Sequence, residues 1–235
     1  MPQANSGAAA HAQAGHDRWR SLYRIGAVAA LLSLVIIPFS VIAFFIWPVF
    51  PDNILDVIQE GWLAGLMSLD AGYLFGNLFV LPVFLVLYAT LREVDEGWAL
   101  VALVLGLMGL LCLPLARPIP EMFAISEKYA AATTEVERAV YQATGEAMLS
   151  HFHGMAYHAH YVLGSLSLLI SSILMLRSNM YSKSLAWVGV VTNVVVFGLY
   201  VPVVGTYISL LSVLGYLVWY ILIARRLFRL ARAPQ

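Results

Sequence analysis

The residues best suited to chemistry are four of the six histidines, which lie close together in one apolar stretch, residues 150–176. They are His151, His153, His158 and His160. At about 100° per residue, one half of a helix over this stretch carries histidine and hydroxyl side chains, and the other half, which includes Phe152 and Met155, is apolar. Such a helix turns its apolar half toward lipid, so we expect the polar half to face the interior of a helical bundle.

The spacing of these histidines indicates whether they could bind a metal ion or a haem. Two ligands on one helix share a metal ion when they are three or four residues apart, as in HExxH. Because the histidines are two, five or seven apart, a metal site formed by His151, His153, His158 and His160 would also need acidic residues or a helix break near Gly154. A bis-His haem b needs a histidine on each of two helices, so it is disfavoured. We predict no cofactor and keep the metal site as the alternative.

A second polar stripe lies on the apolar run at residues 63–91. Asp70, Tyr73, Asn77 and Tyr88 fall within about 60° of one another on a helical wheel. Counted from the basic residue that ends each run, Asp70 lies at about the same depth as His158, near the outer boundary of the membrane. An ionisable residue at a membrane span is a functional candidate, and its partner should be named.

This matched depth predicts a polar ligand pocket near the outer face, formed by Asp70, Tyr73, Asn77, His158 and Tyr161. The competing interpretation is structural, because polar stripes also hold membrane helices together through hydrogen bonds.

Composition excludes several classes of protein. The 235 residues are 61% hydrophobic and 11% charged, with a mean hydropathy of +0.83, which is typical of membrane proteins and not of soluble domains. The single cysteine, Cys112, can form neither an intrachain disulfide nor a cysteine-based metal site. The sequence has no phosphate-binding loop, nucleotide-binding glycine motif or G-x-S-x-G elbow. The expected partner is the lipid bilayer and not nucleic acid, and a protein partner or homo-oligomer stays open.

Six apolar runs are long enough to cross a membrane. We therefore predict an all-α, polytopic bundle of six transmembrane helices over residues 18–235, preceded by a disordered cytoplasmic tail at residues 1–17. The loop at about residues 117–149 should hold two short helices, the second starting at a Thr134-x-x-Glu137 capping box. The six runs are residues 23–47, 63–91, 98–116, 150–176, 185–204 and 207–227.

Lysine and arginine placement predicts the orientation. With the amino terminus inside, ten of the thirteen Lys and Arg residues lie on the inner side, and nine of the thirteen acidic residues lie on the outer side. Basic residues accumulate on the cytoplasmic side of membrane proteins. Both termini should therefore be cytoplasmic, with the loop at residues 117–149 outside.

Several segments resemble one bacterial family. They are DAGYLFGNLFVLPVFLVLYATLR, SEKYAAATTEVERA, FHGMAYHAHYVLGS and the terminal ILIARRLFRL. Together they are similar to an uncharacterised family of six-span integral membrane proteins, catalogued as a domain of unknown function. The resemblance implies a fold and a place in the bacterial cytoplasmic (inner) membrane, and it transfers no active site.

The leading functional prediction is a small-ligand binding or permease-like module built on the Asp/His/Tyr pocket. One alternative is a membrane-embedded, metal-dependent enzyme that uses the histidine cluster. The other is a structural or assembly subunit, in which the polar stripes only join helices.

Overall fold

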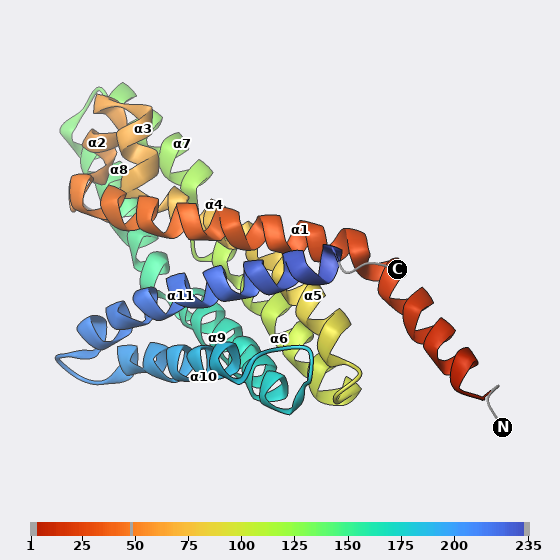
Figure 1. Ribbon diagram of the computed structural model, residues 1–235. Coiled ribbons are helices and arrows are strands. Elements are labelled where there is room, and N and C mark those ends of the chain that lie inside the picture. The colour runs from red at the N-terminus through yellow and green to blue at the C-terminus, as the bar shows by residue number, and fades with distance from the viewer. Residues whose placement is uncertain (1–3, 48, 233–235) are drawn as a thin grey trace. The chain divides into compact units, whose positions relative to one another are not determined.

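The computed structural model describes the backbone of residues 4–47 and 49–232, and the side chains of residues 19–43, 45–47 and 49–232. Over these residues the chain is all-α, with no β-strand (Figure 1). The helices are α1 (Ala4–Ile46), α2 (Ile54–Glu60), α3 (Trp62–Ser68), α4 (Ala71–Leu78), α5 (Val80–Leu91), α6 (Glu96–Leu115), α7 (Ile119–Ala131), α8 (Glu135–Leu149), η1 (Ser150–His153), α9 (Met155–Arg177), α10 (Lys183–Val196), η2 (Phe197–Tyr200) and α11 (Gly205–Arg232).

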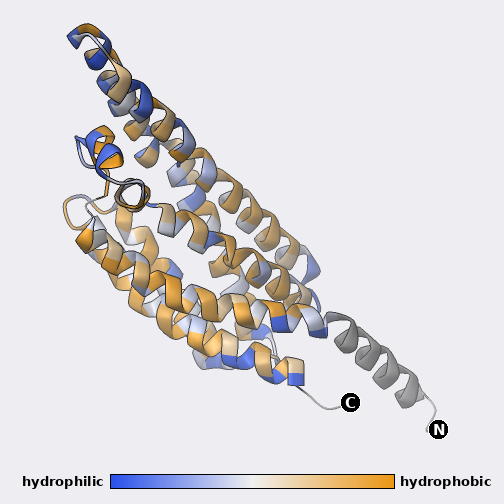
Figure 2. Ribbon diagram, turned by 90° about the horizontal axis from the view of Figure 1, so that it is seen from above, coloured by the Kyte–Doolittle hydropathy of each residue, from blue (hydrophilic) through white to orange (hydrophobic). Residues whose placement is uncertain are grey.

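Six stretches of helix are long and apolar enough to cross a membrane, which confirms the predicted fold class. They are Trp19–Ala43, Ala71–Leu91, Glu96–Ala131, Glu135–Arg177, Lys183–Tyr200 and Gly205–Arg232. Many large apolar side chains on these helices are exposed, among them Phe45, Leu111 and Leu214, and the helices are apolar along most of their length (Figure 2). So much exposed apolar surface is costly in water but favourable in lipid.

The chain divides into two compact units, and α1, α6 and α9 contribute to both. The first unit comprises Met1–Leu34, Phe79–Val104 and Ser167–Gln235, and the second comprises Val35–Leu78 and Leu105–Leu166. The first unit therefore holds α5, α10 and α11, and the second holds α2, α3, α4, α7 and α8.

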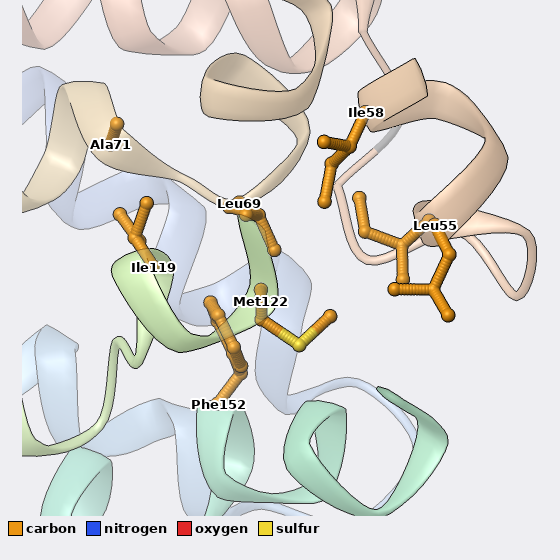
Figure 3. Packing of buried hydrophobic residues seen from close by; sticks show 8 residues of the cluster. Leu55, Ile58, Leu69, Ala71, Ile119, Met122 and Phe152 are labelled. Atoms are coloured by element: carbon orange, nitrogen blue, oxygen red, sulfur yellow. The ribbon is translucent and has the colours of Figure 1, made fainter. Parts of the chain in front are cut away.

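In the second unit, short helices pack around an apolar cluster (Figure 3). Leu55 and Ile58 of α2 face Met122 of α7, and Phe152 of η1 and Leu69 complete the centre. Met122, Phe152 and Leu69 are fully buried. The pair α7 and α8 is the predicted pair of loop helices. The Thr134 capping box is confirmed, because the Thr134 hydroxyl accepts from the Glu137 amide and the Glu137 carboxylate accepts from the Thr134 amide.

In the first unit, α10 packs along α11 through two glycines. A Cβ atom on Gly189 would collide with Ser172 and Trp219, and one on Gly215 would collide with Thr192. Close approach of helix backbones through small residues is the usual packing mode in membranes.

Three predicted segments differ from the structure. Residues 4–17, predicted to be disordered, form the start of α1, and their alanine-rich composition has a high helix propensity. The predicted span at residues 63–91 is split into α3, α4 and α5, so Tyr88 does not continue the stripe of Asp70. The predicted helix at residues 150–176 begins only at Met155, after the 3₁₀ turn η1.

The late start of α9 decides which side chains of that stretch are buried. Ser165, Ser167, Ser171 and Ser172, all on the polar half, are buried as predicted. Phe152 was expected to face lipid but is fully buried, while His151 and His153, which lie beyond the predicted hydrocarbon boundary, are exposed. These three residues precede α9 in η1, so the helical wheel of α9 does not apply to them.

Candidate functional site

The second unit contains a buried arginine, Arg117, at the turn between α6 and α7. Pro118 begins the next helix and has no amide hydrogen to continue α6. This turn holds the Arg117 side chain inside the protein, with only 4% of the residue exposed. The guanidinium Nη2 lies 3.0 Å from Oδ2 of Asp70, and Nη1 donates a hydrogen bond of 2.9 Å to the Phe152 carbonyl.

Four aromatic rings surround the guanidinium. Its Cζ atom lies between 5.1 and 6.0 Å from the ring centroids. At that distance the quadrupole of an aromatic ring attracts a cation. The rings belong to Phe50, Tyr73, Phe152 and Tyr157. We call Arg117, Asp70 and these four residues the arginine site.

Two residues of the arginine site have a left-handed backbone. Phe50 has φ of 57° and Asp70 has φ of 59°. Aspartate tolerates this conformation, but a bulky residue such as phenylalanine rarely adopts it. Residues held in such conformations cluster at functional sites, where surrounding contacts offset the strain.

The ion pair of the arginine site is shielded from water. The Arg117 side chain is 3% exposed and the Asp70 side chain is 25% exposed. Asp70 lies in the turn before the span Ala71–Leu91, outside the candidate spans. Burial raises the pKa of the Asp70 carboxyl, and the charge and hydrogen bond of Arg117 oppose that rise. Protonation of Asp70 would leave a buried guanidinium without its counter-ion.

One nitrogen of the Arg117 guanidinium has no hydrogen-bond partner in the part of the chain that the structure describes. The Nε–H of Arg117 is buried and has no hydrogen-bond partner among the described residues. Burying an amide-like donor without a partner is costly, and native proteins rarely do it. An acceptor that reached Nε would give this nitrogen the hydrogen-bond partner that it lacks.

A hydrogen-bonded chain lies beside the ion pair. Nε2 of His160 is 2.9 Å from the Tyr73 hydroxyl, and Nδ1 of His160 is 2.9 Å from the carbonyl oxygen of Gly109. Because a carbonyl only accepts, Nδ1 must carry the hydrogen, and Nε2 of the neutral ring then accepts from Tyr73. The imidazole, which is 6% exposed as a residue, is thereby held in one tautomer.

The five residues of the predicted pocket make the following contacts. Asp70 and Tyr73 both contact Arg117. Asn77 donates through Nδ2 to the Tyr73 carbonyl, four residues earlier on its own helix. The rings of His158 and Tyr161 both pack against Tyr157, at centroid distances of 5.6 and 5.9 Å.

Two of the predicted pocket residues contact residues that were not in the predicted pocket. The ion-pair partner of Asp70 is Arg117, and the Tyr73 hydroxyl lies within hydrogen-bond distance of His160. Two residues apart on a helix are about 200° apart, so His158 and His160 point in nearly opposite directions. A signal for Arg117 was present: it is one of only three basic residues on the predicted outer side, and it directly precedes a proline.

The four histidines do not form a metal centre in the structure. His153 packs edge-on against Phe50 at 5.1 Å between ring centroids, whereas His160 is bound to Tyr73. Within the described residues, no three His, Cys, Asp or Glu side chains come together in a way that could hold a metal ion.

A separate polar contact lies in the first unit. The Tyr216 hydroxyl donates to Oδ1 of Asn193 at 2.9 Å, and Nδ2 of Asn193 donates to the Gly189 carbonyl. These residues join α11 to α10, as expected for hydrogen bonds that hold membrane helices together.

No protein-family model, no curated protein and no solved structure matches this chain. The resemblance to an uncharacterised bacterial six-span family therefore stays a prediction.

Proposed function

We propose that this chain is a small-ligand binding or permease-like protein of the bacterial inner membrane, with both termini in the cytoplasm and the arginine site near the outer face. The observation that carries the proposal is the unpartnered Nε–H of Arg117, which is buried beside a carboxylate and four aromatic rings.

The chemistry of the site favours a small anion, such as a carboxylate, as the ligand. The unused donor belongs to a guanidinium, which binds planar oxyanions through paired hydrogen bonds. The Asp70 carboxylate already neutralises this charge at 3.0 Å. An anion therefore binds well only when Asp70 is protonated, because two carboxylates beside one guanidinium repel each other.

Binding of the anion is then coupled to uptake of a proton. Lowering the pH toward the pKa of Asp70 populates its neutral form, which frees the guanidinium charge for the ligand. A permease that releases both species on the other side of the membrane would carry the anion together with a proton. The hydrogen bond between Tyr73 and His160 holds the Tyr73 ring in place beside the Arg117 guanidinium.

The test uses the full-length protein in an uncharged detergent, with acetate, lactate and nitrate as probes and calorimetry as the readout. We expect a saturable heat of binding for at least one probe, and its loss in Arg117→Gln. The matched control is His151→Gln, an exposed residue of η1 outside the arginine site, which should bind as the unchanged protein does. Equal binding by Arg117→Gln would overturn the proposal.

A structural role is the second candidate, and a specific observation favours it. Tyr73, His160 and Gly109 satisfy one another's hydrogen bonds across α4, α9 and α6, as a purely structural contact would. In that case Arg117→Gln lowers the thermal stability, and no probe anion raises the melting temperature of the unchanged protein. A melting temperature that rises with anion concentration separates the two roles.

A further inference from the structure

The first unit contains a pocket at the end of α11, separate from the arginine site. Its volume is about 380 Å³, and its walls come from the turn between α9 and α10 and from the last turns of α11. A volume of this size suits a small polar ligand or headgroup.

Three arginines of α11 line the pocket: Arg225, Arg226 and Arg229. Arg225 and Arg229 are four residues apart and lie one above the other on the helix, and Arg226 is about 100° around from Arg225. No Asp or Glu is among the described lining residues. Neither ion pair of the described residues includes any of these arginines.

Arg226 supplies the observation that points to a ligand. Its Nε–H is buried and has no hydrogen-bond partner among the described residues. A buried guanidinium donor without an acceptor is costly, and two further guanidinium groups in the same pocket add repulsion. An anion in the pocket removes both costs.

The opposite wall is fixed by its own hydrogen bonds. The Tyr181 hydroxyl lies 2.7 Å from Oγ1 of Thr90, and the Ser182 hydroxyl caps α10 by accepting from the Leu185 amide. The turn therefore presents a preformed surface, and the start of α10 adds partly positive amide groups. The positive charge of the pocket comes from the three arginines of α11.

The depth of the pocket along α11 indicates which anion can reach it. Residues 205–224 carry no charged side chain, and about twenty helical residues span the hydrocarbon core of a bilayer. The three arginines follow directly, at the level of lipid headgroups. Phosphate is the commonest anion at that level, and guanidinium groups bind it through paired hydrogen bonds.

We propose that this pocket binds a phosphate group through Arg225, Arg226 and Arg229. The group comes either from an anionic phospholipid with a small headgroup or from a soluble phosphate compound. Both sources present the same oxyanion to the same guanidinium groups.

The test measures binding to the full-length protein in an uncharged detergent. The probes are dihexanoyl phosphatidic acid, dihexanoyl phosphatidylcholine and inorganic phosphate. The variants are Arg226→Gln, Arg226→Lys and Arg229→Gln. Arg232→Gln is the matched control, because it removes the same charge from the same helix but Arg232 does not line the pocket. Thermal melting checks that each variant is folded, and the exposed Arg229 keeps the test available if Arg226→Gln does not fold.

We expect saturable binding of phosphatidic acid, weaker binding of phosphatidylcholine, and affinity reduced about tenfold or more in Arg226→Gln and Arg229→Gln. Arg226→Lys should keep part of the affinity, and Arg232→Gln should change it less than about twofold. Tighter binding of inorganic phosphate than of phosphatidic acid would assign a soluble ligand, and tighter binding of phosphatidic acid would assign the lipid. Equal losses in Arg232→Gln and Arg226→Gln, or no saturable binding of any probe, would overturn the proposal.

Discussion

Arg117 combines two features that usually exclude each other, burial and a permanent charge. Arginine keeps its proton at any physiological pH, so burial cannot be relieved by neutralisation. The cost is met by Asp70, by the carbonyl of Phe152 and by four aromatic rings. Removing one partner of such a pair leaves an uncompensated charge, which is far more destabilising than removing both.

In a double-mutant cycle, we expect the effects of substituting Arg117 and Asp70 on the free energy of unfolding to be strongly coupled. Arg117→Gln should lower the free energy of unfolding by about 2–3 kcal/mol, somewhat less than for a fully buried pair because Asp70 keeps 25% exposure. Adding Asp70→Asn should recover a large part of that loss. Denaturant unfolding in detergent micelles measures both, and additive effects of the two substitutions would show that the residues do not interact.

His160 predicts a single tautomer. Its Nδ1 should carry the hydrogen, because the Gly109 carbonyl only accepts. In protein labelled with ¹⁵N-histidine, the chemical shifts of His160 should therefore show a protonated Nδ1 and an unprotonated Nε2 at neutral pH. Tyr73→Phe removes the donor to Nε2 and should cost about 1 kcal/mol while shifting the Nε2 signal. A protonated Nε2 in the signal of His160, identified by its loss in His160→Gln, would contradict this hydrogen-bond assignment.

At the scale of helices, the apolar runs predicted which segments form spans but not where helices break. Composition carries the first signal, since about twenty apolar residues cannot be stable in water as an exposed helix. The breaks depend on single backbone conformations, such as the positive φ of Asp70 and the 3₁₀ turn before Gly154. Tertiary contacts stabilise these conformations, so a helical wheel drawn through them misplaces side chains.

Because α6 approaches α9 closely within the second unit, we expect substitution by alanine to be costly at Gly109 and tolerated at Gly164. A Cβ on Gly109 would lie 3.0 Å from the Gly164 amide nitrogen and 3.2 Å from the His160 carbonyl oxygen, both rigid backbone atoms. Gly109→Ala should therefore cost about 1–3 kcal/mol and disturb the hydrogen bond to His160. A Cβ on Gly164 meets nothing within 4 Å, so Gly164→Ala is the matched control. Similar melting temperatures for the two variants would contradict the close approach.

Removing the Thr134 cap should destabilise only the start of α8. Thr134→Ala removes the side-chain cap that accepts from the Glu137 amide and should cost about 1 kcal/mol. Hydrogen exchange of the first turn of α8 should become about fivefold faster, with the transmembrane helices unchanged. Thr144→Ala is the control on the same helix, because its hydroxyl only bonds back to the Val140 carbonyl. Faster exchange in Thr144→Ala than in Thr134→Ala would argue against the cap.

At the scale of the whole molecule, the sequence predicted the fold class and named two residues of the candidate site. Six spans and an all-α fold follow from composition and run length. Asp70 and Tyr73 were found because polar residues in an apolar run are conspicuous. Arg117 was not included in the predicted pocket, although it is one of three basic residues on the predicted outer side, because a charge in a loop after a helix is ordinary. Only the fold reveals that this loop residue is buried.

The proposed topology can be tested by accessibility. After replacing Cys112 with serine, single cysteines at Arg232 and at Gln142 would report the two sides of the membrane. A membrane-impermeant maleimide should label the cysteine of Gln142→Cys in intact cells and that of Arg232→Cys only in opened cells. The same side for both would contradict the proposed orientation.

The measurement that tests the central proposal most directly is proton uptake on anion binding. Calorimetric titration of the full-length protein with acetate or nitrate, in two buffers with different heats of ionisation, gives the number of protons taken up for each anion bound. We predict a net uptake of protons on binding, at most one for each anion, and an affinity that increases as the pH is lowered. Asp70→Asn, which mimics the protonated carboxyl, should bind the anion with no proton uptake and little pH dependence. Binding without proton uptake in the unchanged protein, or the same uptake in Asp70→Asn, would contradict the account.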